Sequence, residues 1–157
     1  MMFIDDHWDY YSGLPSPKAY EKNKARVWVN GTFDVLHRGH LEMLEFASGF
    51  GTLRVGIDYD KRVKQLKGNE RPFNSWEDRK YFMSRIVGVN DVVGFGSQEE
   101  LEMRIQEWSP NYLIVGSDYK DKEVIGSQYA EKVIFFDKID GFSSTKILDY
   151  GKDISNR

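Results

Sequence analysis

Short apolar runs alternate with amphipathic stretches along most of this chain, and turn-forming residues separate them. Five of the runs are rich in valine, isoleucine, leucine and phenylalanine, which is typical of buried strands. They lie at residues 26–30, 53–57, 91–95, 112–115 and 132–136. Strands that alternate with helices form βαβ units with right-handed crossovers. The pattern therefore predicts an α/β fold: a single Rossmann-like, doubly wound domain with a five-stranded parallel sheet.

The stretches between these runs predict helices. The helix after the first run is expected to bury Leu41, Leu44 and Ala47 and to end at Gly49 or Gly51. A short charged helix within 58–68 leads into a basic loop. Ser75 and Ser97 look like N-caps. The helix that begins after Ser75 is expected to run to about Val87, with Trp76, Met83 and Ile86 as core candidates. The helix that begins after Ser97 is expected to run to Trp108. A final helix is expected to begin at the serine run 143–145 and to end near Tyr150.

Length and composition indicate one soluble domain. The 157 residues are 40% apolar and 30% charged, and the formal net charge of −3 argues against a general nucleic-acid binder. The chain has no cysteine, no apolar run long enough to span a membrane and no leader-like start, so we expect a cytoplasmic protein without a membrane partner. We divide it into an N-terminal extension with a short helix (1–25), the domain (26–150) and a C-terminal tail (151–157).

Three unusual segments follow strands of the predicted sheet. Residues 31–40 follow the first strand, 116–119 follow the fourth and 140–145 follow the fifth. Ligands of open α/β sheets bind beyond the carboxyl ends of the strands, where the strand order reverses. In the first segment, His37 and His40 lie near one helix N-terminus, where free backbone N–H groups and the helix dipole favour anions. Gly31 and Gly39 allow a close approach to the backbone there.

The groups collected at these ends are almost all donors or cations. They comprise two helix N-termini, two imidazoles, three hydroxyls and four cationic side chains, namely Lys64, Lys67, Arg71 and Arg79. Such a site stabilises charge spread over phosphate oxygens. No nucleophile with an adjacent base is visible, and none is needed if the attacking group is itself an ionised phosphate. Protein ligands for a metal are not expected, but Mg²⁺ would accompany a nucleoside triphosphate.

The phrase Gly-Thr-Phe-Asp-x-x-His-x-Gly-His at 31–40 resembles the signature of the nucleotidyltransferase superfamily, which includes cytidylyltransferases and heptose-phosphate adenylyltransferases. Residues 66–68, 71–79, 116–120 and 140–145 are each similar to the adenylyltransferase domain of ADP-heptose synthase. The resemblance covers residues 27–149. It implies transfer of AMP from ATP to a sugar 1-phosphate, with a heptose as the expected acceptor, and release of pyrophosphate. It also implies a homodimer.

The resemblance implies roles for individual residues. The catalytic set that it implies is His37, His40, Lys67 and Arg79. The nucleotide-binding set is Gly31, Thr32, Phe33, Asp34, Gly39, Gly116, Asp118, Tyr119, Ser143, Ser144 and Thr145. The substrate-binding set is Asp60, Lys64, Arg71 and Lys138. Taken singly, several of these have plainer explanations: a salt bridge on a helix surface for Arg79, a solvated loop for Lys67 and an N-cap for the serines.

Two departures from the adenylyltransferase pattern keep an alternative open. Thr32 stands where those enzymes usually have cysteine, and threonine is more usual at this position in cytidylyltransferases. The second departure is that no fused sugar kinase is found in these 157 residues. The alternatives are a cytidylyltransferase that makes CDP-glycerol and a non-catalytic nucleotide-binding module. Lys138 stands where glycerol-phosphate cytidylyltransferases have arginine, whose planar guanidinium a lysine does not reproduce. ATP is therefore the expected nucleotide.

Overall fold

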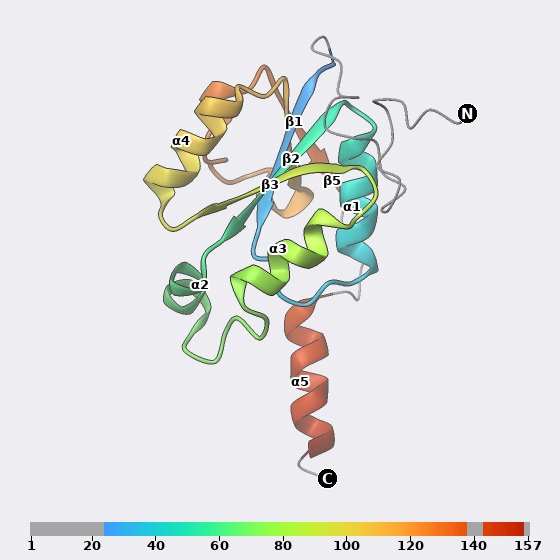
Figure 1. The fold of residues 1–157 in the computed structure, drawn as a ribbon, viewed down its shortest axis with the longest axis vertical. Coiled ribbons are helices and arrows are strands. Elements are labelled where there is room, and N and C mark those ends of the chain that lie inside the picture. The colour runs from blue at the N-terminus through green and yellow to red at the C-terminus, as the bar shows by residue number, and fades with distance from the viewer. Residues whose placement is uncertain (1–23, 138–142, 156–157) are drawn as a thin grey trace, which may run out of the picture.

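Five parallel strands form one sheet in the order β3-β2-β1-β4-β5, with helices on both faces (Figure 1). The structure is a computed structural model that describes residues 24–137 and 143–155. Its strands are β1 (Arg26–Gly31), β2 (Thr52–Asp58), β3 (Val89–Phe95), β4 (Tyr112–Gly116) and β5 (Lys132–Phe136). Its helices are α1 (Arg38–Ser48), α2 (Asp60–Lys67), α3 (Trp76–Ser84), α4 (Gln98–Trp108) and α5 (Ser144–Ser155), with short 3-10 turns η2 (Ser117–Tyr119) and η3 (Ser127–Tyr129).

The strand order reverses between β1 and its neighbour β4. The chain moves outward from β1 through β2 to β3, then returns to pair β4 with the other side of β1. A crevice forms at such a reversal, because the connections leave the two central strands in opposite directions. This topology confirms the predicted doubly wound, five-stranded parallel sheet. It also brings the segment after β1 and the segment after β4 to the same edge of the sheet.

Two apolar cores lie on the two faces of the sheet. On one face Leu44 and Ala47 of α1 and Met83 of α3 pack against the valines and isoleucines of β1 and β2. On the other face Leu101 and Ile105 of α4 pack with a second set of sheet residues, centred on Trp28, Phe95 and Leu113. Because both faces are covered, the central strands are apolar almost throughout rather than alternating. The two cores fix the strand ends that carry the site.

Several predicted boundaries differ from the structure. Leu41 was expected in the core but is 46% exposed, because the buried face of α1 is centred on Leu44 and Ala47 and Leu41 lies at its edge. Helix α3 ends at Ser84 rather than near Val87. Helix α5 continues to Ser155 instead of ending near Tyr150, so the expected tail is helical through 155. The helix continues through Gly151, since a glycine inside an exposed helix lowers its stability by only about 1 kcal/mol relative to alanine. The helix expected within the N-terminal extension lies outside the described residues.

Helix α5 extends away from the sheet (Figure 1). At its start, the Ser144 hydroxyl donates to the carbonyl of Val35 at 2.6 Å. Farther along, Lys152 pairs with Glu70 at 2.9 Å across exposed surface. Exposed apolar side chains line one side of the helix, namely Ile147, Tyr150 and Ile154. Among the described residues, no helix is both long and apolar enough to cross a membrane.

Candidate functional site

The two histidines of the first segment form a reciprocal cap at the start of α1. The backbone N–H of His40 donates to Nδ1 of His37 at 3.4 Å, and the backbone N–H of His37 donates to Nδ1 of His40 at 3.3 Å. The two rings stack with centroids 3.8 Å apart. Because each Nδ1 accepts a hydrogen bond, the proton of each neutral ring is assigned to Nε2. The cap therefore presents two Nε2–H donors from one helix N-terminus.

Phe33 packs against this histidine pair. Its backbone has φ of +48°, a left-handed conformation that is uncommon for a bulky residue, and its side chain is buried. The ring lies edge-on to His40 with centroids 5.3 Å apart. A Cβ on Gly31 would come within 3.1 Å of the same ring. The glycine thus makes room for Phe33, and its predicted contact with a ligand stays a prediction.

Asp34 ties the segment after β1 to the segment before α3. Its Oδ1 accepts the backbone N–H of Asn74 at 2.9 Å, and its Oδ2 accepts the backbone N–H of Phe73 and Nε of Arg71, both at 2.8 Å. Burial acts to raise the pKa of this carboxyl, but the two backbone hydrogen bonds and the Arg71 guanidinium outweigh it and hold the pKa below its ordinary value. Asp34 is therefore a buried, ionised clasp between two loops.

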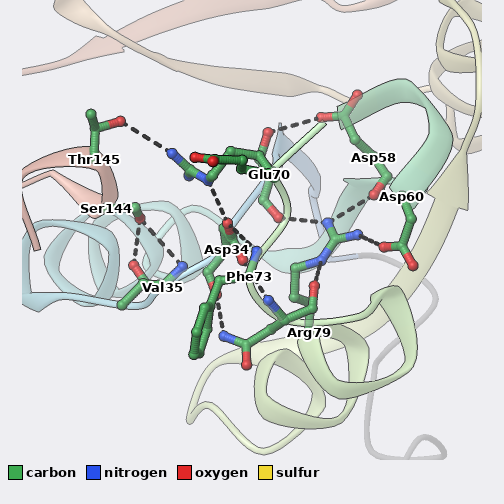
Figure 2. Close-up of polar contacts among 12 residues, drawn as sticks. Asp34, Val35, Asp58, Asp60, Glu70, Phe73, Arg79, Ser144 and Thr145 are labelled. Carbon is green, nitrogen blue, oxygen red and sulfur yellow. Dashed lines mark hydrogen bonds and ion pairs between the residues drawn. The ribbon is translucent and has the colours of Figure 1, made fainter. Parts of the chain in front are cut away.

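Arg79 joins the loop after β1, the end of β2 and the loop before α3. Its Nη1 donates to the carbonyls of Thr32 at 2.9 Å and Asp58 at 2.8 Å, and its Nε donates to the carbonyl of Asn74 at 3.0 Å. Its Nη2 pairs with Asp60 at 2.6 Å (Figure 2). The side chain is fully buried, and four of the five guanidinium N–H donors are engaged. In this structure Arg79 holds loops together, and the predicted phosphate contact stays a prediction.

The start of α5 contacts the same region (Figure 2). The Ser143 hydroxyl accepts the backbone N–H of Lys146 at 3.0 Å, which is an N-cap. The Ser144 hydroxyl bonds both backbone groups of Val35. The Thr145 hydroxyl accepts Nη1 of Arg71 at 3.4 Å. The structure thus brings all three hydroxyls to the site, and at least two of them also have structural partners.

Asp58 lies at the carboxyl end of β2 and was not selected from the sequence. Its carboxylate pairs with Arg62 at 2.7 Å and lies 3.5 Å from the Thr32 hydroxyl. Burial raises its pKa against the opposing charges of Arg62, Arg79 and Lys67. The available signal was a carboxylate that directly follows a buried apolar strand. Such a residue lands at the edge of the sheet where the site forms.

The other predicted residues are distributed around this edge. Lys64 and Lys67 lie exposed on α2, and Asp60 begins that helix. Gly116 ends β4, and Asp118 and Tyr119 follow in the exposed turn η2. Gly39 is in the first turn of α1. Lys138 lies outside the described residues.

An open cleft of about 860 Å³ separates the segment 67–73 from α5. Lys67, Arg71 and Lys152 supply cationic groups to its walls, and Phe73 and Leu148 supply apolar ones. Two carboxylates, Glu70 and Asp149, also line it, and Glu70 pairs with Lys152, so the cleft combines a small excess of positive charge with an apolar surface. It adjoins the start of α5, where Arg71 meets Thr145.

Three carboxylates near the site form ion pairs with arginines. Asp34 pairs with Arg71, Asp58 with Arg62 and Asp60 with Arg79. Within 24–137 and 143–155, no group of three or more histidine, cysteine, aspartate or glutamate side chains could hold a metal ion. The described residues therefore do not fit a Mg²⁺ held by protein side chains alone.

The fold and this edge define the class of protein: a doubly wound α/β domain with a histidine-capped helix N-terminus at its switch point, which is where ligands of such sheets bind. The model of the family described as cytidylyltransferase-like matches residues 28–148. The chain therefore belongs to the cytidylyltransferase-like family of nucleotidyltransferases.

Several curated relatives carry the name bifunctional protein HldE. The protein from Nitratiruptor sp. is 39% identical over 137 residues, or 87% of this chain and 29% of that protein. The protein from Campylobacter jejuni subsp. doylei is 41% identical, covering 85% and 29% of the two chains. The protein from Helicobacter pylori is 37% identical, covering 88% and 30%. The chain thus spans less than a third of the length of these relatives.

A solved structure shares the fold. It is the lipopolysaccharide core biosynthesis protein from Thermoplasma volcanium, which is 23% identical to this chain with a TM-score of 0.62. The match covers 74% of this chain and 98% of that one.

Proposed function

We propose that this protein transfers AMP from ATP to a sugar 1-phosphate, with D-glycero-β-D-manno-heptose 1-phosphate as the candidate acceptor. The observation that carries the proposal is the reciprocal histidine cap, which presents two Nε2–H donors at a helix N-terminus on the sheet edge where the strand order reverses. The relatives named bifunctional protein HldE support the heptose acceptor, and so does the resemblance of 66–68, 71–79 and 116–120 to ADP-heptose synthase.

The proposed reaction is a single displacement at the α-phosphorus. An oxygen of the sugar phosphate bonds to that phosphorus, and the bond from phosphorus to the oxygen bridging to the β-phosphate breaks. The products are an ADP-sugar and pyrophosphate. A phosphate oxygen is ionised at neutral pH, so the protein needs no general base. Its work is to align two polyanions and to stabilise the charge that accumulates on the departing pyrophosphate.

The donors of the site divide this work. His37 and His40 donate through Nε2 to oxygens of the triphosphate, and the positive pole of α1 adds to their effect. Lys67 is exposed on α2 and lines the cleft, where it neutralises phosphate charge. Mg²⁺ bound with the triphosphate would neutralise part of its charge.

The alternative acceptor and nucleotide are glycerol 3-phosphate and CTP. Thr32 favours this alternative, since its residue type is the one more usual in cytidylyltransferases. The test is pyrophosphate release with ATP or CTP, each offered with heptose 1-phosphate and with glycerol 3-phosphate. Turnover with ATP and heptose 1-phosphate supports the proposal. Turnover confined to CTP and glycerol 3-phosphate favours the alternative, and nucleotide binding without any turnover favours a non-catalytic module.

We also propose that the protein is a homodimer. Three apolar side chains on one side of α5 support this, because Ile147, Tyr150 and Ile154 are 43%, 64% and 51% exposed in the single chain. A second copy would bury them. Light scattering at micromolar concentration should report twice the chain mass of 18.3 kDa. A monomer both with and without nucleotide would contradict the proposal.

A further inference from the structure

Both carboxylate oxygens of Asp34 are hydrogen-bonded within the protein. The carboxylate is completely buried, and its two oxygens accept three hydrogen bonds from the segment 71–74. Its own backbone carbonyl accepts the Asn74 side chain at 2.7 Å. A carboxylate also repels phosphate oxygens. The nucleotide contact expected of Asp34 from the resemblance therefore finds no support in the geometry.

Arg71 is the charged member of this group. Its Nε pairs with Asp34, and its Nη1 reaches Thr145 on α5, so the side chain spans from the loop after β1 to the last helix. Its Nη2 is buried and has no hydrogen-bond partner among the described residues. A buried donor without a partner is costly, so an acceptor that reaches it binds favourably. The same side chain lines the cleft together with Lys67 and Lys152.

We propose that Asp34 is a positioning residue, which fixes Arg71 so that its guanidinium receives a phosphate group in the cleft between 67–73 and α5. The inference rests on the proposed function, because it assigns a role in phosphate binding at the same site. The carboxylate holds Nε at 2.8 Å and thereby sets the plane of the guanidinium, whose buried Nη2 keeps a donor that no described residue engages. Arginine suits this role, since a planar fork binds a carboxylate on one edge and a phosphate on another.

The phosphate has two possible sources, the triphosphate of the nucleotide and the phosphate of the acceptor. Both offer ionised oxygens, and the excess of cationic over anionic side chains in the cleft suits either. Separate measurements with each substrate distinguish them: loss of Arg71 raises KM for the substrate whose phosphate it binds and changes KM for the other less than threefold.

The first test is a double-mutant cycle on kcat/KM with Asp34→Asn, Arg71→Ala and the double variant. A small misplacement of a positioning group costs about 10²-fold in rate, and we expect a loss of that order from each single variant. Because Asp34 acts through Arg71, the double variant should lose little more than the worse single variant. Losses that multiply would mean that Asp34 contacts substrate itself, and unchanged kcat/KM in Asp34→Asn would remove its role. Arg104→Ala on α4, whose arginine pairs with Glu100, is the matched control and should retain activity.

The second test does not require turnover. Calorimetry with inorganic pyrophosphate should show binding to the wild-type chain, weakened about tenfold in Arg71→Ala and in Asp34→Asn, as expected for losing one charge-assisted contact. Equal affinity in all three proteins, or no binding by the wild type at millimolar concentration, would overturn the inference. If pyrophosphate binds as expected but no nucleotide and acceptor react, the proposed function fails while the phosphate site stands.

Circular dichroism spectra and melting curves establish whether each variant is folded. If Asp34→Asn does not fold, Asp34→Glu replaces it in both tests. The longer side chain keeps the charge but moves the carboxylate away from Arg71 and the two backbone N–H groups. A folded Asp34→Glu protein should lose at least tenfold in kcat/KM and in pyrophosphate affinity, with little further loss when Arg71→Ala is added. Wild-type values in this variant would contradict the role of Asp34.

Discussion

Replacing Arg79 by methionine should unfold the protein at a clearly lower temperature. Methionine fills much of the same space but removes every donor of the guanidinium. The carbonyls of Thr32, Asp58 and Asn74 would then lose their arginine partner, and Asp60 would lose its ion pair. The loop after β1, the end of β2 and the loop before α3 would no longer be held to one another.

The magnitude follows from the burial of these groups. Removing one partner of a buried ion pair typically costs about 3–5 kcal/mol, and each buried polar group left without a partner costs about 1–3 kcal/mol. Asp60 is 38% exposed and can be hydrated, which favours the lower end of the range. We expect a loss of about 3 kcal/mol in the free energy of unfolding. For a chain of this size the loss corresponds to a melting temperature lower by roughly 6–12 °C.

The assay is urea denaturation followed by circular dichroism, with melting curves as a second measurement. Arg85→Met is the matched control, because Arg85 is an exposed arginine at the end of the same helix, stacked over Tyr81. Its free energy of unfolding should change by less than about 0.5 kcal/mol. A loss below about 1 kcal/mol in Arg79→Met would refute the reasoning, since the carbonyl contacts would then contribute nothing net.

Three further predictions follow from the site. His40→Ala should lower kcat about 10²- to 10³-fold in a folded protein, because one donor to the transition-state charge is lost; more than half of wild-type turnover would contradict this. Gly31→Ala should lower kcat with a smaller effect on melting, because the new methyl group displaces Phe33 and with it the His40 ring; a crystal structure with Phe33 unmoved would exclude the cause. The lowered pKa of Asp34 stabilises the fold above the ordinary aspartate pKa of about 4 and this contribution is lost as the pH falls through the folded value. Stability measured from pH 6 down to pH 3 should therefore fall more steeply in the wild type than in Asp34→Asn, and equal slopes would contradict the assignment.

The sequence alone determined the strands and the position of the two histidines at the start of α1. The five strands are readable because valine, isoleucine and leucine runs of the right length are a local property of the chain. The histidine phrase is equally local, since the cap that it forms involves residues three apart. Alternation of strands and helices then left few topologies, and the observed sheet order is one of them.

Only the tertiary structure decided what the side chains of the site do. In the sequence Arg79 looks like a charged residue on a helix surface. In the structure it is buried and donates to the carbonyl of Thr32, which is 47 residues away in the chain. Asp34 became a clasp for Arg71 over a separation of 37 residues, and Ser144 reached Val35 over 109. Such contacts depend on which strand ends become neighbours, and that is fixed by the packing of the two cores. Local pattern carries the periodicity of an element, whereas the partner of a polar side chain is set by the folded chain as a whole.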